Sequence, residues 1–241
     1  MEPERLIFQN LEALSREAAK RFASSAKNAI EARGKFIAVL TGGRTSKRTY
    51  ELLSLPPYRD DISWGKIHIF LSDERFFPFE HPESNFGAIR KILFSKVPLP
   101  EAHLHPFVVE AASLEEAARK SETSFRHFFG EMSIPRFDFI FLGIGRDGHV
   151  AGLFPGRSAF KTEKRLVAFS EESGGFDRLS LTLPVLNRGR EIVFLAAGKE
   201  KARIVAKILT NRGGYLPAGS VHPSDGKCLW LLDQEAALFL D

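Results

Sequence analysis

Cysteine is nearly absent from this sequence, in which Cys228 is the only one among 241 residues. A disulfide framework within one chain is therefore excluded, and such low cysteine usage is typical of a reducing compartment. No apolar run approaches the roughly 20 residues that a helix needs to span a bilayer. The first ten residues, MEPERLIFQN, also lack the apolar core of a secretory signal. We therefore expect a cytoplasmic protein that does not bind membranes.

Long blocks of basic residues are also missing, although the formal net charge is +4. Lysines and arginines are spread along the chain among acidic residues, a pattern that does not favour nucleic-acid binding. The mild basic excess fits a small anionic substrate, and it fits equally well a solvated surface that happens to be basic. Internal repeats, low-complexity segments and clear linkers are absent too, so we expect a single domain over residues 1–241.

Apolar runs and helical patterns alternate along the chain. Runs without polar alternation predict strands buried on both faces of a sheet, and they cover residues 36–40, 67–71, 137–145, 191–197 and 228–232. Shorter strand candidates are RLVAF and LSLTL. Apolar spacing predicts helices over residues 5–33, 45–53, 84–95, 113–130, 198–209 and the tail 233–240. This order predicts an α/β fold with a mainly parallel sheet flanked by helices, and a small subdomain around residues 158–185.

Four of the predicted buried strands each lead into a polar or glycine-rich loop. In an open parallel sheet, the carboxyl ends of the strands share one edge, and ligands bind there. We therefore expect these loop residues to be neighbours: Thr41, Gly42, Gly43, Asp73, Arg75, Asp147, His149 and Lys201. The stretch TGGRT precedes a helix, so it is either a phosphate cradle or a plain strand-to-helix turn. Lys201 would add a positive charge to the site, or it is a solvated helix lysine.

The stretch FLGIGRDGHVAGLFPG, residues 141–156, has two interpretations. GIGRDG fits a dinucleotide-binding pattern, but Pro155 would end the helix that such a cradle needs, and Asp147 would face the pyrophosphate with like charge. RDGH instead places a carboxylate beside an imidazole, which is typical of acid–base chemistry. We interpret His149 as a candidate general base that Asp147 orients, and a loop histidine with a satisfied hydrogen bond is the alternative.

Covalent catalysis and metal binding have little support in the sequence. No G-x-S-x-G elbow occurs, and Cys228 lies in the apolar run CLWLL, which favours a buried, inert thiol over a nucleophile. His103 and His105 form an H-x-H pair, but no third ligand follows at a recognisable spacing. We interpret both histidines as structural or surface residues.

Three stretches together resemble the 6-phosphogluconolactonases: SDERFFPFEHPESNFGAIRKILF, FDFIFLGIGRDGHVAGLFPG and LSLTLPVLNRGREIVFLAAGKEKA. The similarity runs from about residue 36 to the end of the chain. The related glucosamine-6-phosphate deaminases share the glycine-rich loop and a GxxDGH loop, but they usually continue into a segment that carries a catalytic glutamate. Here the continuation is AGLFPG, which has no acid, and this favours the lactonase.

The resemblance implies a fold of the deaminase/ribose-phosphate-isomerase type with no metal or organic cofactor. It implies hydrolysis of 6-phospho-D-glucono-1,5-lactone to 6-phosphogluconate in the oxidative pentose phosphate pathway, with His149 as the base that activates water. Asp73, Arg75, Arg178 and Lys201 match polar positions of the family's site, and the two later basic residues are best suited to the phosphate. A sugar-phosphate deaminase or isomerase and a non-catalytic phosphosugar-binding protein remain as alternatives.

Three positions depart from the family pattern. Arg44 stands where the family usually has serine, Ser46 where it usually has proline, and Gly152 where it usually has serine. We expect the cradle, which includes Thr45, to hold its anion partly through Arg44. The sequence does not determine the oligomeric state, and a monomer is kept as the expectation.

Overall fold

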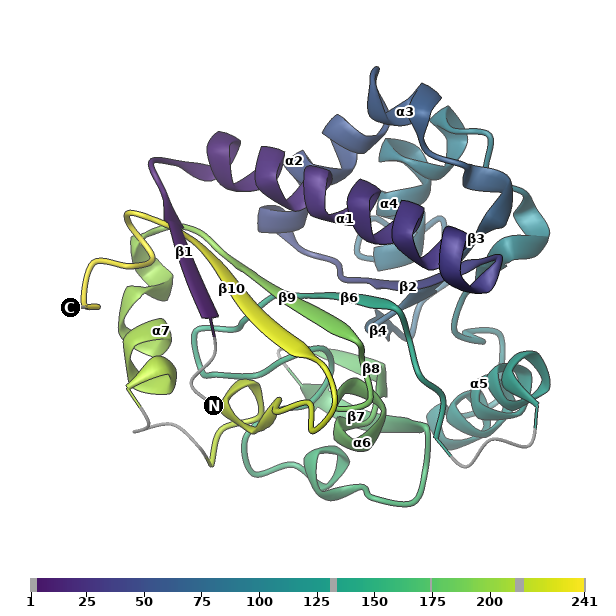
Figure 1. The fold of residues 1–241 in the computed structure, drawn as a ribbon. Coiled ribbons are helices and arrows are strands. Elements are labelled where there is room, and N and C mark those ends of the chain that lie inside the picture. Colours follow the sequence, from purple (N-terminus) through teal and green to yellow (C-terminus); the bar gives the residue numbers. More distant parts are fainter. Residues whose placement is uncertain (1–3, 131–133, 174, 211–214, 241) are drawn as a thin grey trace.

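The computed structural model describes residues 4–130, 134–173, 175–210 and 215–240 (Figure 1). Within these residues, seven strands form the main sheet, and every neighbouring pair is parallel. In spatial order the strands are β1 (Glu4–Phe8), β10 (Lys227–Asp233), β9 (Glu191–Ala196), β6 (Phe139–Leu142), β2 (Phe36–Leu40), β3 (Ile67–Leu71) and β5 (Leu104–His105). The predicted α/β fold with a mainly parallel sheet is confirmed.

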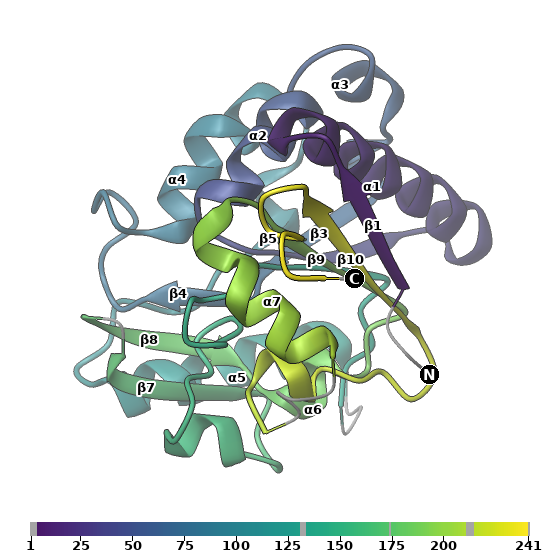
Figure 2. The same cartoon turned by 90° about the vertical axis from the view of Figure 1, so that its left-hand side faces the viewer.

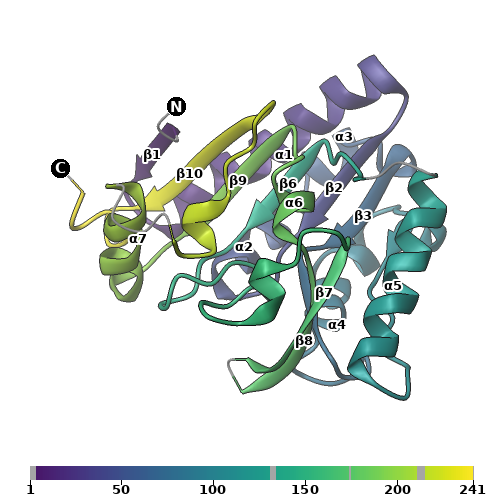
Figure 3. The same ribbon diagram turned by 90° about the horizontal axis from the view of Figure 1, so that it is seen from below.

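Helices cover both faces of the main sheet. One face carries α1 (Leu11–Arg33), α2 (Arg44–Leu53), α3 (Tyr58–Asp61) and α4 (Asn85–Ile92), as Figures 1 and 2 show. The view from below in Figure 3 shows what lies on the other face: α5 (Leu114–Phe129), α6 (Leu183–Leu186) and α7 (Ala202–Leu209). None of the described helices is both long and apolar enough to cross a membrane.

A second, three-stranded antiparallel sheet lies on the same side as α5 and α6 (Figure 2). Its strands are β4 (Asp73–Arg75), β8 (Phe176–Leu181) and β7 (Val167–Ser173), in the order β4-β8-β7. The segment 158–185, predicted as a small subdomain, thus supplies β7 and β8, and β8 pairs with β4, which lies just after β3. The register pairs Arg75 with Arg178, so this sheet brings two distant basic residues together.

The core between α1 and the main sheet is rich in phenylalanine. Phe22 is fully buried on α1, and its ring meets Phe36 of β2 edge-on with centroids 5.2 Å apart. It also meets Phe139 of β6 edge-on at 5.8 Å. Burying each such ring stabilises the fold by about 1.5–3 kcal/mol. This packing fixes β2 and β6, whose carboxyl ends carry two of the predicted site loops.

The predicted helix over residues 5–33 is wrong in its first part. Residues 4–8 form β1, and Glu4 pairs with Leu229 of β10 at the edge of the sheet. The helix α1 starts at Leu11, after the side chain of Asn10 accepts the Ala13 N–H at 3.0 Å. Asparagine before a helical run is an N-cap signal that could have located this boundary. Residues 4–8 form a strand because they pair with β10, which is distant in sequence, so no local pattern predicts this strand.

The predicted tail helix over residues 233–240 is also wrong. This segment forms turns, in which the Asp233 carboxylate accepts the Ala236 N–H at 2.7 Å and the Leu240 N–H bonds the Ala237 carbonyl at 2.9 Å. Helix propensity alone does not decide the conformation of so short a segment. The strands β4 and β5 were not predicted, because runs of three and two residues carry no periodicity.

Three histidines, His68, His103 and His105, gather at the β3–β5 edge. His68 Nδ1 and His105 Nε2 lie 3.1 Å apart, and the His68 and His103 ring centroids lie 4.1 Å apart. Among the described residues, no three His, Cys, Asp or Glu side chains are arranged to hold a metal ion. Burial lowers the pKa of His68 and of His105 to about 4, and neighbouring positive charge adds to the effect.

We expect these two histidines to make folding stability depend on acid pH. The unfolded chain takes up protons there near pH 6.5, whereas the folded chain takes them up only near pH 4. Between these values the unfolded state binds more protons, so the free energy of unfolding decreases as the pH falls. A His68→Gln/His105→Gln variant should show a shallower fall of Tm over this window, and His222→Gln should not. Equal slopes in the parent and the double variant would contradict this prediction.

Candidate active site

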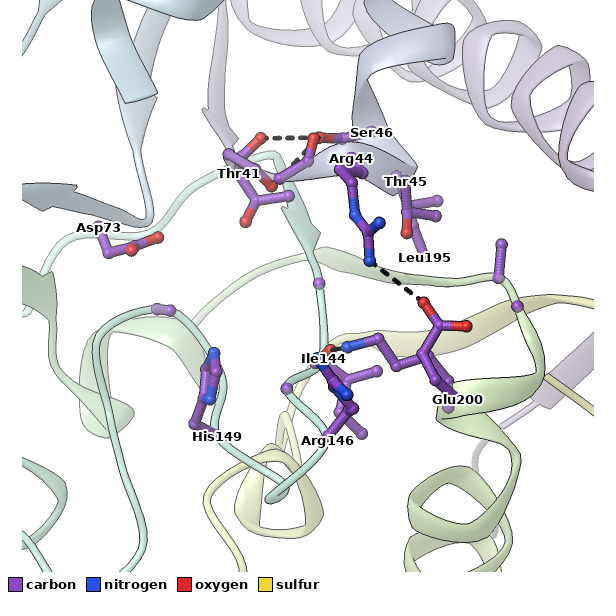
Figure 4. A pocket seen from close by; sticks show the side chains of 18 of the residues that line it. Thr41, Arg44, Thr45, Ser46, Asp73, Ile144, Arg146, His149, Leu195 and Glu200 are labelled. Carbon is purple, nitrogen blue, oxygen red and sulfur yellow. Dashed lines mark hydrogen bonds and ion pairs between the residues drawn. The ribbon is translucent and has the colours of Figure 1, made fainter. Parts of the chain in front are cut away.

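The carboxyl ends of β2, β3, β6 and β9 open into one cleft of about 710 Å³ (Figure 4). Most of the predicted site residues line it: Thr41, Gly42, Gly43, Arg44, Thr45, Asp73, Arg75, His149, Arg178 and Lys201. Asp147 is not among the lining residues, although it contacts His149. The four loops predicted to meet at one sheet edge therefore do meet there.

The loop between β2 and α2 is held by two side chains of α2. The Tyr50 hydroxyl donates to the Thr41 carbonyl at 2.7 Å and accepts the Thr41 N–H at 3.0 Å. The Ser46 hydroxyl lies 3.1 Å from the same carbonyl. A Cβ on Gly42 would overlap the side chain of Asn85, so glycine is required at that position. The backbone of the cradle is thus fixed before any ligand arrives.

The first turn of α2 faces this cleft. Its N-cap residue is Gly43, which has no side chain to accept the first amide hydrogens of the helix. Arg44 and Thr45 follow it and line the cleft. Free amides and the positive end of the helix dipole make this terminus suitable for an anion.

Three cationic side chains face the cleft beside this helix terminus: Arg44, Arg146 and Lys201. Arg44 Nη2 lies 3.3 Å from Glu200 Oε1, and its side chain is 90% exposed. Lys201 Nζ donates to the Ile144 carbonyl at 2.7 Å, as the dashed line in Figure 4 marks. Burial lowers the pKa of Lys201, and the positive charges of Arg146 and Arg44 lower it further, whereas the carboxylate of Glu200 raises it. The cluster therefore has an excess of positive charge that a bound anion would relieve.

Asp73 and Arg178 form a buried ion pair at the opposite side of the cleft. Arg178 Nη1 donates to Asp73 Oδ2 at 3.0 Å, and the two side chains are 9% and 6% exposed. The Ser72 hydroxyl donates to the other carboxylate oxygen at 2.9 Å. Arg75, paired with Arg178 across the sheet, contacts the Asn85 side chain. Asp73 is thus a fixed hydrogen-bond acceptor whose charge is balanced.

His149 and Asp147 lie on the loop after β6. His149 Nδ1 is 2.7 Å from Asp147 Oδ1, which also accepts the His149 backbone N–H at 3.2 Å. Burial opposes ionisation of Asp147, but the hydrogen bond and charge of His149 hold its pKa at about 2. An ionised carboxylate can only accept, so Nδ1 carries the hydrogen and Nε2 is left as the basic atom. A Cβ on Gly145 would overlap both side chains, so the pair needs glycine there.

The loop after β6 does not have the form of a dinucleotide cradle. The Gly148 N–H bonds the Gly145 carbonyl at 3.1 Å, and the Gly145 N–H bonds the His149 carbonyl at 2.9 Å. These bonds close a turn rather than start a helix. In the described part of the chain, the next helical turn is Ser158–Lys161. The helix N-terminus that would bind a pyrophosphate is therefore absent at this loop.

Sequence reasoning missed several residues that line the cleft, among them Arg146, Asn85 and Glu200. Arg146 lies inside GIGRDGH, and its place beside a predicted phosphate cradle was a usable signal. Nothing in the local pattern marks Asn85 or Glu200, which only tertiary packing brings to the cleft. Gly152, one of the departures from the family, does not line the cleft; its N–H donates to Ser180 Oγ at 3.0 Å.

Comparisons with known proteins agree with this arrangement. The 6-phosphogluconolactonase of Synechocystis sp. is 38% identical over 212 residues, which cover 86% of each chain. That of Rattus norvegicus is 33% identical over 238 residues, 97% of this chain and 92% of the relative. The crystal structure of 6-phosphogluconolactonase from Thermotoga maritima has a TM-score of 0.84 and 29% identity, covering 96% of this chain and 99% of the other. The family model for glucosamine-6-phosphate isomerases/6-phosphogluconolactonase matches residues 9–230, and the chain belongs to this family.

Proposed function

We propose that this chain hydrolyses 6-phospho-D-glucono-1,5-lactone to 6-phosphogluconate, with His149 activating the water. Relatives named for 6-phosphogluconolactonase activity match most of the chain, and this supports the reaction. One observation supports the role of His149: its imidazole faces the cleft while an ionised carboxylate holds Nδ1 at 2.7 Å. That arrangement leaves Nε2 directed to accept a proton from water.

The proposed reaction has two proton transfers through one imidazole. Water attacks the lactone carbonyl carbon while His149 Nε2 takes a proton from it, and Asp147 stabilises the resulting imidazolium. The tetrahedral oxyanion then collapses, the bond from the carbonyl carbon to the ring oxygen breaks, and the imidazolium returns the proton to that ring oxygen. Arg75 is a donor that could stabilise the oxyanion. Asp73 can only accept, so it would bind a hydroxyl group of the sugar.

The phosphate group is assigned to the cationic cluster of Arg44, Arg146 and Lys201, together with the first turn of α2. Arg178 also lines the cleft, but it is paired with Asp73, so we assign it to holding that carboxylate rather than the phosphate. Anchoring the phosphate away from the carbonyl fixes the ring near the base, and remote binding energy thereby serves orientation.

We expect Lys201→Met to raise KM by about 10- to 150-fold, because a charge-assisted contact to an anion is worth about 1.5–3 kcal/mol. The methionine keeps most of the apolar length of the side chain and removes its charged end, including the Nζ hydrogen bond to the Ile144 carbonyl. Initial rates at increasing substrate concentration measure the change. Lys199→Met, a variant of the exposed lysine in the same turn, is the matched control and should leave KM unchanged. An unchanged KM in Lys201→Met would move the phosphate site elsewhere.

Acid release from freshly prepared lactone, corrected for spontaneous hydrolysis, tests the reaction itself. A deaminase would instead release ammonia from glucosamine 6-phosphate, and a non-catalytic binding protein would bind 6-phosphogluconate without turnover. A deaminase is the weaker candidate, because residues 150–156 contain no acid that could serve as its second carboxylate. We also propose that the whole chain is one domain, that it is a cytoplasmic monomer, and that it requires no cofactor.

A further inference from the structure

We propose that Phe154 is a positioning residue that holds the imidazole of His149 in its working orientation. This inference rests on the proposed function, in which His149 is the base. The Phe154 and His149 rings stack with centroids 4.2 Å apart and planes inclined by 30°. Phe154 is 7% exposed, so it presents a fixed surface to the imidazole.

The chain returns to His149 through a tight turn over residues 150–153. The Val150 N–H bonds the Leu153 carbonyl at 3.2 Å, and the Leu153 N–H bonds the Val150 carbonyl at 2.9 Å. Ala151 within this turn has φ of 51°, a left-handed conformation that alanine rarely adopts. The surroundings must impose such a conformation, and its result is that Phe154 folds back onto the imidazole five residues earlier.

The turn is tied to the second sheet on both sides of its backbone. The Gly152 N–H donates to Ser180 Oγ of β8 at 3.0 Å, and the Gly152 carbonyl accepts from Ser170 Oγ of β7 at 3.1 Å. The Arg178 guanidinium also lies over the Phe154 ring, with its carbon 5.4 Å from the centroid. The position of Phe154 is therefore set by β7 and β8 as well as by the loop that carries His149.

Asp147 alone does not fix the imidazole plane. A single hydrogen bond at Nδ1 sets the position of that atom, but the ring can still turn about the bond, which swings Nε2 away from the water. A stacked ring removes this freedom, because turning the imidazole would break the face-to-face contact. A stacking contact is worth enough to change a rate by about 3- to 10-fold. Phe154 is not among the residues that line the cleft, so we expect its replacement to change kcat and not KM.

The test compares Phe154→Leu with Phe154→Tyr, which keeps the ring. We expect Phe154→Leu to lower kcat by about 3- to 10-fold. KM and the Kd of 6-phosphogluconate should not change. Phe154→Tyr should keep most of the parental kcat. Phe107→Leu is the control, because Phe107 is also a buried phenylalanine but its ring packs against Phe125 and not against His149. It should lower Tm and leave kcat unchanged. Phe154→Met replaces Phe154→Leu if the leucine variant does not fold.

Several outcomes would overturn the positioning role. One is a parental kcat in Phe154→Leu, and another is an equal loss of kcat in the leucine and tyrosine variants. A change confined to KM would also overturn it, as would failure of both the leucine and methionine variants to fold. His149→Ala, measured alongside, separates this inference from the proposed function. If His149→Ala keeps its kcat, the proposed base fails and this inference falls with it. If His149→Ala loses kcat while Phe154→Leu does not, only the role of Phe154 fails.

Discussion

Replacing His149 by alanine is expected to lower kcat by about 10²–10⁴-fold, the usual effect of losing a general base. KM should change little, because the cationic cluster that we assign to the phosphate is untouched. The lactone opens slowly without any enzyme, so each rate must be corrected for this background before the comparison. The variant should still bind 6-phosphogluconate, which shows that the cleft is intact.

The pH dependence and a matched control sharpen this test. The rate of the parent should fall at acid pH, because a protonated imidazole cannot accept a proton from water. Asp147 stays ionised down to about pH 2, so its own protonation cannot account for that fall. His127→Ala, which removes an exposed histidine of α5, should keep the parental kcat. A folded His149→Ala protein with near-normal corrected kcat would leave Asp147 or Asp73 as the candidate base.

Replacing Arg178 by methionine should lower the free energy of unfolding by about 3–5 kcal/mol. The substitution leaves the Asp73 carboxylate buried without its ion-pair partner, and an unpaired buried charge is far more costly than the pair. Chemical denaturation with urea at neutral pH measures the loss. Because Asp73 also lines the cleft, the same variant should lose activity at temperatures where it is still folded.

Two comparisons test whether the unpaired buried charge of Asp73 causes the loss of stability in Arg178→Met. An Asp73→Leu/Arg178→Met double variant removes both charges and should be more stable than the single Arg178→Met variant. Arg59→Met breaks the exposed pair with Asp60 and should leave the free energy of unfolding nearly unchanged. A double variant that is less stable than Arg178→Met would show that packing, not the charge, dominates at this position.

The strands of the main sheet were predictable where burial on both faces leaves a plain apolar run. β2 is buried at every position, and its bounds match the predicted range 36–40. β6 is shorter than the predicted 137–145, because the glycines at 143 and 145 already belong to the loop. β1 could not be predicted, because five partly exposed residues become a strand only beside β10. Local pattern is sufficient for the sheet interior and insufficient at its edge.

The cleft was predictable to the extent that strand ends define it. Parallel strands share a carboxyl edge, and this rule alone predicted that Thr41, Asp73, His149 and Lys201 lie close together. The rule did not predict Asn85, because that residue lies at the start of α4 and not at a strand end. The ion pair of Asp73 with Arg178 also escaped it, because the β4–β8 pairing spans about a hundred residues of sequence.

The pairing of β1 with β10 has a consequence for synthesis on the ribosome. Glu4 is made about 225 residues before its partner Leu229. At roughly 5–20 residues per second, β1 waits on the order of ten to forty-five seconds for that partner. Once β9 (Glu191–Ala196) is made, it lacks its neighbour β10 for only about two to seven seconds of this time. During those seconds the edge of the nascent sheet stays open next to the strand that precedes Lys201. The protein is therefore expected to become active only after β10 has been made, and nascent chains stalled before β10 should depend on chaperones to avoid aggregation.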